Sequence, residues 1–230
     1  MSAFNLPFRP LIVTIDGPAG AGKTTVSKLL AKKLGYRYID TGALYRGVAV
    51  AAREAGVSAL DDAGLEALCR RIELDLIPDE EGLRIALNGT DITNQIRTPE
   101  ISMLASAVSA RPVVRAFLLA TQRDLAARKA VVAEGRDMGT VVFPQAEAKF
   151  FLDADANIRA QRRYEELNHK ANAGPSLTTV ESEMRQRDRN DASRAVAPLQ
   201  PAADAIRIDS SRLSLAQVVD EMLRHIAKIT

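Results

Sequence analysis

At 230 residues, the chain has the length of one α/β domain with an insertion or two, since domains commonly run from about 50 to 250 residues. Its composition, 47% hydrophobic and 26% charged, is that of a globular protein with a buried core, which excludes long disorder. Lys and Arg (31) nearly balance Asp and Glu (29), and the net charge of +2 gives no reason to expect nucleic acid held by bulk electrostatics.

The cysteine count and the hydropathy of the sequence predict the cellular compartment of the protein. Cys69 is the only cysteine, so no disulfide can form within the chain, and a reducing cytoplasm is expected. It lies in LEALCRRI and is interpreted as a buried helix residue. No stretch approaches the ~18 apolar residues of a membrane span, and residues 1–10 show no leader or transit pattern. We therefore predict a cytoplasmic protein with no membrane partner.

Apolar runs typical of buried strands recur between helical patterns. They are LIVTID (11–16), YRYID (36–40), AVVAEG (130–135), AKFFLD (148–153) and AIRID (205–209). Five such runs separated by helices predict an α/β fold, a parallel sheet with helices on both faces. In the last helix, an apolar stripe at helical spacing follows a Ser214 N-cap and is expected to pack on the sheet. The stripe comprises Leu215, Val218, Val219, Met222, Leu223 and Ile226.

Two regions interrupt this alternation. Between residues 72 and 97 the apolar period drops to two, and Asn88-Gly89 is typical of a hairpin turn, so we predict a small antiparallel insertion. Helices resume at Thr98-Pro99 and after Arg111-Pro112. The second interruption, ANAGPS (171–176), is rich in Gly, Pro and Ser between two charged helical stretches and is interpreted as the tip of a mobile flap.

Residues 17–25, GPAGAGKTT, satisfy G-x-x-x-x-G-K-[ST] between a predicted strand and a predicted helix. Glycines let successive backbone N–H groups converge on phosphate oxygens, and the helix start adds its positive dipole end. We predict a nucleoside-triphosphate cradle in which Lys23 reaches the β- and γ-phosphates and a hydroxyl, of Thr24 or of Thr25, faces Mg²⁺. The cradle comprises Gly17, Ala19, Gly20, Ala21, Gly22, Lys23, Thr24 and Thr25.

Other polar residues predict a second, smaller substrate. A GTPase would carry a D-x-x-G switch and an N-K-x-D base-reading motif, and neither occurs at a suitable place. The strand AVVA is instead followed by EGRDMG, in which a cationic and an acidic residue, Arg136 and Asp137, are neighbours. Asp40 or Thr41 can cap the helix that begins in TGALYRG, and Arg46 emerges one turn in. A hydroxyl and an arginine at one helix start suit a phosphate monoester.

Together these motifs resemble one family. IDGPAGAGKTT, DTGALYR, SAVSARPVVR, EGRDMGTVVFP and RDRNDASRAVAPLQPAADA occur in this order between Ile12 and the final helix. The chain is thus similar to the bacterial cytidylate kinases, which phosphorylate CMP and dCMP from ATP; GRDMGTVVFP and SRAVAPL are far more specific than the phosphate loop. The resemblance implies a P-loop NTPase fold with a five-stranded parallel sheet, a small antiparallel β insert and a helical lid.

The resemblance also implies how one nucleoside monophosphate kinase domain is divided. The core would comprise residues 10–40, 110–155 and 200–230, the monophosphate-binding region with its insert residues 41–109, and the lid residues 156–192. The family's CMP-site motifs fall on Thr41, Arg46, Ser106, Arg115, Arg136, Asp137, Arg187, Asp191 and Arg194.

Cytosine chemistry divides these residues among roles. The base presents an N4 amino donor beside N3 and O2 acceptors, so Asp137 with the donors Arg115 and Ser106 suits it. The phosphate is expected among Arg46, Arg136 and Arg194, which leaves Arg187 and Asp191 for the sugar hydroxyls. UMP carries a carbonyl at position 4 and should be the poorer substrate, because a buried carboxylate facing it loses a hydrogen bond.

Arg159, Arg162 and Arg163 share one helical face after AKFFLD. By pattern alone they suit a solvated basic stripe equally well, but the resemblance places the family's lid here, with arginines that close over the transferring phosphoryl group. The implied catalytic residues are Lys23, Arg136, Arg159 and Arg163. A catalytic base is unnecessary, because the acceptor is already a charged phosphate oxygen.

The expected activity is ATP-dependent phosphorylation of CMP and dCMP with Mg²⁺, for which no direct protein ligand is assigned. Glu134 is interpreted as supporting the fold or reaching Mg²⁺ through water. The alternatives are a kinase for another acceptor, such as a different monophosphate or shikimate, and an ATP-dependent interaction module. Balanced charge and the lack of an obvious apolar seam favour a monomer. The choices between CMP and dCMP and between ATP and GTP stay open, as does the role of the insert.

Overall fold

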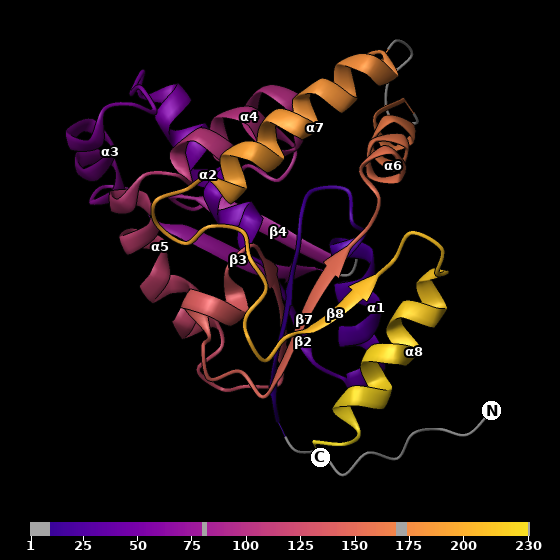
Figure 1. Cartoon of the computed structure of the whole chain (residues 1–230). Coiled ribbons are helices and arrows are strands. Elements are labelled where there is room, and N and C mark those ends of the chain that lie inside the picture. The colour runs from indigo at the N-terminus through magenta and orange to yellow at the C-terminus, as the bar shows by residue number, and fades with distance from the viewer. Residues whose placement is uncertain (1–9, 80–81, 169–173, 230) are drawn as a thin grey trace.

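The computed structural model describes residues 10–79, 82–168 and 174–229, which form a five-stranded sheet with a three-stranded sheet beside it (Figure 1). The strands of the larger sheet are β1 (Ile12–Asp16), β2 (Arg37–Asp40), β6 (Val131–Gly135), β7 (Ala148–Asp153) and β8 (Ile206–Asp209). They lie in the order β2-β6-β1-β7-β8, and all neighbours are parallel. The predicted α/β fold is confirmed, with each strand within one residue of its predicted run.

The register of the sheet brings three chain segments to one edge. β1 is the central strand and pairs with β6 and β7, and its Val13 and Ile15 are fully buried. Asp16 at the end of β1 is opposite Gly135, while Asp40 at the end of β2 is opposite Glu134. Ligand sites of parallel sheets form at such carboxyl ends, so the phosphate loop after Asp16 lies next to the EGRDMG segment.

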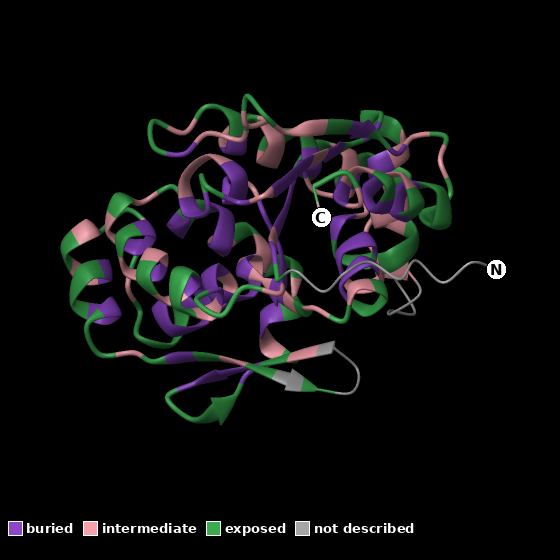
Figure 2. Ribbon diagram, turned by 90° about the horizontal axis from the view of Figure 1, so that it is seen from below, coloured by how far each residue is buried: buried purple, intermediate pink, exposed green. Residues whose placement is uncertain are grey.

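Helices cover both faces of this sheet. On one side lie α1 (Lys23–Leu34) and α8 (Leu215–Ile226), whose apolar residues pack with those of β1 and β7, and on the other lie α2 (Thr41–Glu54) and α5 (Pro112–Leu125) (Figure 1). Figure 2 shows that buried residues gather where these helices face the strands. Alternation of strands with helices that bury one stripe each explains this layering.

The final helix confirms the predicted cap and corrects one residue of the predicted stripe. Ser214 caps α8 by accepting a hydrogen bond from Gln217 N, and the Gln217 side chain accepts from Ser214 N, which completes a capping box. The stripe is buried from Val218 onward, whereas Leu215 is 39% exposed. Leu215 is the first residue of the helix, before the turn that meets the sheet.

The predicted insertion is an antiparallel sheet of β3 (Leu74–Asp79), β4 (Gly82–Leu87) and β5 (Thr90–Asp91). Asn88 and Gly89 join β4 to β5 with φ of 49° and 78°, as a tight hairpin turn requires. Ile85 is buried against α2, where a Cβ on Gly47 would lie 2.7 Å from Leu74 Cδ2. The absence of a side chain at Gly47 therefore lets the insert pack directly on the helix.

The remaining described elements are helices, and the first of them packs on α2 and α5. They are α3 (Asp62–Cys69), η1 (Gln95–Arg97), α4 (Pro99–Val108), η2 (Met138–Val142), α6 (Ala156–Asn168) and α7 (Leu177–Ala192). Thr98 caps α4, Pro112 begins α5, and Cys69 is buried as predicted, which raises the pKa of its thiol to about 11. Helices α6 and α7 pack together as a hairpin that contacts α4 through α7. Residues 171–173 of the predicted flap tip lie outside the described residues.

Hydropathy along the described helices gives one further finding. No single helix among them has the length and apolar content to cross a membrane, and only α4 with α5, bent by 99° at their junction, pass that test as a pair.

Candidate functional site

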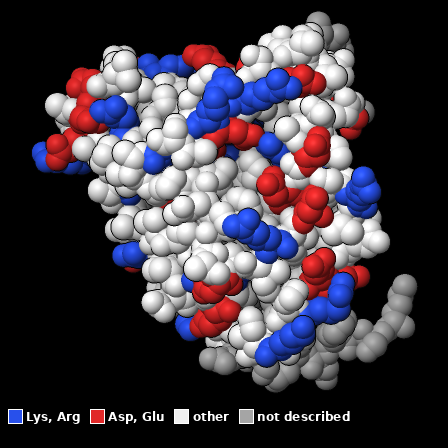
Figure 3. Space-filling model, viewed as in Figure 1, with Lys and Arg blue, Asp and Glu red and all other residues white. Residues whose placement is uncertain are grey.

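A pocket of about 730 Å³ lies at the carboxyl ends of β1, β2 and β6, between the phosphate loop, α2, α4 and the α6–α7 hairpin. Every residue of the predicted site lines this pocket except Gly17 and Arg159. On the outer face shown in Figure 3, basic and acidic side chains are interspersed. The positive charge needed for a phosphorylated ligand comes from the lysines and arginines that line the pocket.

The phosphate loop owes its shape to glycines at positive φ. Gly17, Gly20 and Gly22 have φ of 146°, 75° and 90°. A Cβ on Gly17 would lie 1.9 Å from the carbonyl oxygen of Leu152, so Gly17 is required by the close approach of β7 although it does not line the pocket. Gly22 caps α1 without a side-chain hydrogen bond, which leaves the first N–H groups of α1 available to an anion.

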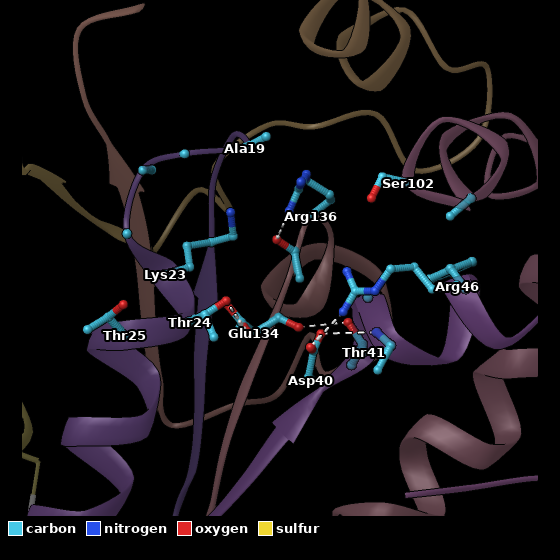
Figure 4. A pocket seen from close by; sticks show the side chains of 18 of the residues that line it. Ala19, Lys23, Thr24, Thr25, Asp40, Thr41, Arg46, Ser102, Glu134 and Arg136 are labelled. Carbon is cyan, nitrogen blue, oxygen red and sulfur yellow. Dashed lines mark hydrogen bonds and ion pairs between the residues drawn. The ribbon is translucent and has the colours of Figure 1, made fainter. Parts of the chain in front are cut away.

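Lys23 is held inside this loop. Its Nζ donates to Pro18 O at 2.6 Å, and the side chain points back toward the loop near Ala19 (Figure 4). Burial, with a smaller effect of Arg136, lowers the pKa of Lys23 to about 7, and Glu134 opposes the shift. An anion placed on the loop would stabilise the charged ammonium and reverse this shift.

Glu134 contacts both α1, which follows the phosphate loop, and α2. Its Oε1 accepts hydrogen bonds from Thr24 Oγ1 at 2.8 Å and from the Tyr38 hydroxyl, and its backbone oxygen accepts from Thr41 Oγ1 at 2.7 Å. Burial raises the pKa of Glu134. Thr25 points away from this carboxylate (Figure 4), so Thr24 is the hydroxyl that shares a site with an acidic oxygen.

Asp191 binds one arginine that follows β6 and another that lies three residues further along its own segment. It is 1% exposed and accepts from Arg136 Nε at 2.9 Å and from Arg194 Nη2. Burial alone would raise the pKa of Asp191, but Arg136, Arg194 and Arg187 together hold it below its ordinary value. One carboxylate therefore organises three guanidinium groups.

Arg187 lies where like charges accumulate. Burial and repulsion from Arg136, Arg46 and Arg163 together lower its pKa to about 10, against the attraction of Asp191. Within the described part of the chain, its buried Nε has no hydrogen-bond partner. A cluster with this excess of positive charge is suited to a multiply charged anion.

Arg46 is oriented by the residue that caps its own helix. Asp40, the N-cap of α2, accepts from Ala43 N at 3.0 Å and from Arg46 Nη2 at 2.8 Å. Of the two predicted caps, Asp40 is therefore the one used. Thr41 is 1% exposed, and its hydroxyl is occupied by Glu134 O, so it ties α2 to β6.

The opposite end of the pocket has an acidic group beside an aromatic wall. Asp137 is 2% exposed and pairs with Arg115, whose guanidinium lies 5.6 Å from the ring centroid of Tyr45. Burial raises the pKa of Asp137 despite the opposing effect of Arg115. Ser106 Oγ lies buried nearby on the pocket wall without a partner among the described residues. One carboxylate and one free hydroxyl thus lie where a planar polar base can be read.

Sequence reasoning missed the residue that fixes the backbone around Asp137. The carboxylate of Asp16 accepts from Met138 N and from Gly139 N, both at 2.8 Å. Burial raises the pKa of Asp16 to about 6, although both backbone hydrogen bonds oppose the shift. An acidic residue at the end of a largely apolar strand was the available signal, because a buried carboxylate needs such donors.

The three arginines of α6 separate in the structure. Arg163 lines the pocket and donates to Glu166 at 2.8 Å, and Arg162 lines it while binding Ser210 O at 2.8 Å. Arg159 does not line the pocket, because its guanidinium binds Ala19 O and Asp188. Arg159 connects the hairpin to the phosphate loop here, and its catalytic role stays a prediction.

Comparisons with known proteins agree on one family. A family profile described as cytidylate kinase matches residues 13–228. The chain is 51% identical to a cytidylate kinase of Geobacter sp. (strain M21) over 93% of its own length and 91% of that protein. It is 44% identical to a cytidylate kinase of Pasteurella multocida (strain Pm70), covering 94% and 95% of the two chains. Among solved structures, an uncharacterized protein from Eubacterium ventriosum is similar in fold, with a TM-score of 0.50 at 12% identity over 94% and 98% of the chains.

Proposed function

The chain belongs to the cytidylate kinase family, and we propose that it transfers the γ-phosphoryl group of ATP to the phosphate of CMP or dCMP in the pocket described above. The observation that carries this proposal is the convergence, in one pocket, of a phosphate loop, an arginine cluster around Asp191 and the Asp137–Arg115 pair. An enzyme that transfers a phosphoryl group between two bound nucleotides needs all three features.

The donor half is formed by the phosphate loop. Its backbone N–H groups and Lys23 would hold the β- and γ-phosphates. Thr24 Oγ1 and Glu134 Oε1, which are 2.8 Å apart, fit Mg²⁺, because this ion prefers oxygen ligands and combines few protein groups with phosphates and waters. When bound, Mg²⁺ would neutralise phosphate charge. Among the described residues no group of three or more metal-ligating side chains forms a dedicated cage.

In the acceptor half, we assign the phosphate of the monophosphate to Arg46, Arg136 and Arg187. This differs from the roles expected from sequence chemistry, which gave the phosphate to Arg194 and the sugar to Arg187. Arg187 and Arg194 both interact electrostatically with Arg136 and Asp191. Arg187 also interacts with Lys23, Arg46 and Arg163, whereas Arg194 interacts with Arg115 and Tyr45. We therefore assign Arg194 to the base end and Arg187 to the phosphate end.

Catalysis in this geometry rests on positioning and charge neutralisation. The attacking phosphate oxygen is already anionic, so proton removal is unnecessary. Arg136 lies close enough to Lys23 to lower its pKa, so both cations would neutralise charge on the transferring group. Helices α6 and α7, the proposed lid, would bring Arg163 over it and exclude water.

A panel of acceptors tests the proposed function. With ATP and Mg²⁺, a coupled assay of ADP release should give strong activity with CMP and dCMP, weak activity with UMP and background rates with AMP and shikimate. Preference for another acceptor would support a related kinase, and background rates with every acceptor would support an ATP-dependent interaction module; either result contradicts the proposal.

Binding of the donor should draw a proton onto Lys23. At pH 8 a lysine of pKa about 7 is mostly uncharged, and a bound triphosphate raises that pKa, so up to about one proton should be taken up. Calorimetric titration with a non-hydrolysable ATP analogue and Mg²⁺, in buffers of different ionisation enthalpy, measures this uptake. Lys23→Met should abolish it. An apparent binding enthalpy that does not depend on the buffer would refute the assigned interaction.

Asp137→Asn should reduce the preference for CMP over UMP, measured as the ratio of kcat/KM values, by at least about tenfold. The carboxylate accepts from the cytosine N4 amino group, whereas an amide can also donate to the carbonyl of uracil. Asp188→Asn is the matched control, because Asp188 pairs with Arg159 outside the pocket. An unchanged ratio in Asp137→Asn would remove Asp137 from base recognition.

A further inference from the structure

Ser109 occupies the corner between α4 and α5 and lines the pocket. We propose that it is a positioning residue for the acceptor nucleotide, whose hydroxyl holds Arg194 in the orientation that the pyrimidine ring requires. This inference rests on the proposed function and adds a residue that the sequence motifs did not single out.

Two hydrogen bonds fix the orientation of the Ser109 hydroxyl. The residue is 5% exposed, and its Oγ donates to Ser106 O at 2.9 Å. Because this bond uses the only hydroxyl proton, the oxygen is left as an acceptor, and it accepts from Arg194 Nη2 at 2.8 Å. The direction of the first hydrogen bond therefore leaves the Ser109 oxygen as an acceptor for the Arg194 guanidinium.

The contact with Arg194 is more than helix capping. Capping of α4 is provided by Ser109 N, which donates to Ala105 O at 3.0 Å, and the bond to Ser106 O is also local. Arg194 lies 85 residues away, beyond α7. The hydroxyl thus joins the acceptor half of the pocket to the end of the proposed lid.

Arg194 depends on few contacts for its position. Its side chain is 5% exposed and is held by Asp191 and by Ser109. Its buried Nε has no partner in the described ranges, so it is free to donate to a ligand. Without the Ser109 hydroxyl, Asp191 alone would orient this guanidinium, and Asp191 also binds Arg136.

Ser109 contacts the two arginines of the base end through different atoms. Arg115 Nη1 donates to its backbone oxygen at 3.2 Å, whereas Arg194 uses its side chain. Ser109→Ala therefore removes the contact with Arg194 and keeps the one with Arg115. The substitution therefore tests the orientation of Arg194 while both arginines remain in the protein.

Steady-state kinetics of Ser109→Ala test the inference. Loss of a hydrogen bond to a charged group should raise KM for CMP about tenfold, while KM for ATP and kcat stay within about twofold of wild type. Thr98→Ala is the matched control, because the Thr98 hydroxyl caps the other end of α4 and does not line the pocket. It should lower Tm and leave KM for CMP unchanged.

The Arg194→Ala background shows through which residue Ser109 acts. There, Ser109→Ala should add no further rise in KM for CMP. The inference is overturned by an equal rise in that background, by the same rise in Thr98→Ala, or by an unchanged KM in Ser109→Ala. A wild-type protein that did not phosphorylate CMP would instead refute the proposed function, so the two failures are distinguishable.

Discussion

Lys23→Met should lower kcat for phosphorylation of CMP by about a thousandfold, the largest kinetic effect expected of any single substitution in this chain. Lys23 is 7% exposed and lies among the phosphate loop, Glu134 and Arg136, where its charge is little screened by water. Negative charge moves toward the β- and γ-phosphate oxygens during transfer, and methionine keeps the length of the side chain without the charge.

The matched control for Lys23 is Lys33→Met on the same helix. Lys33 is 42% exposed in an ion pair with Asp220, and its replacement should leave kcat within about twofold, since exposed pairs contribute little. The rates are measured at saturating CMP and ATP with Mg²⁺. A kcat in Lys23→Met within about tenfold of wild type would mean that the loop does not hold the transferring phosphate.

Asp191→Asn should destabilise the protein by about 3–5 kcal/mol, because it leaves buried arginines without their counter-ion. Arg136 and Arg194 both bind this carboxylate, and Arg187 is attracted to it. The amide can accept one hydrogen bond but carries no charge to offset the three guanidinium groups. Urea unfolding of both proteins at pH 7 measures the free-energy difference.

The pH dependence of that difference gives a second check. The pKa of Asp191 is lowered in the folded state, so its stabilisation is complete above the ordinary value of 3.8 and is lost as the pH falls through the folded pKa. The difference between wild type and Asp191→Asn should therefore shrink only below about pH 4. Asp220→Asn, which breaks the exposed pair with Lys33, should cost less than about 1 kcal/mol. Equal losses in the two variants would contradict the central role of Asp191.

Local patterns were sufficient to predict most of the fold. Buried parallel strands carry continuous apolar runs, and the five runs from LIVTID to AIRID each became a strand of the sheet. The change to a period of two located the insert, whose turn at Asn88-Gly89 has the positive φ that the pair favours. Ser214 and Thr98 were found as caps because capping is a contact between near neighbours in sequence.

Long-range contacts account for what the sequence did not show. Arg159 has the spacing of a lid arginine, yet its binding to Ala19 O depends on how the α6–α7 hairpin lies on the phosphate loop. The proposed reassignment of Arg187 to the phosphate and of Arg194 to the base depends on which groups surround each of them after folding. Ser109 resembles any serine at a helix end until Arg194, 85 residues later, is placed beside it.

The path of the γ-phosphoryl group tests the central claim most directly. The protein is incubated with ATP labelled at the γ-phosphate, Mg²⁺ and CMP, and the products are separated. The account predicts that the label appears in CDP, with little in inorganic phosphate, because the attacking oxygen belongs to CMP held by Arg46, Arg136 and Arg187. Label found only in inorganic phosphate, or remaining in ATP, would contradict it.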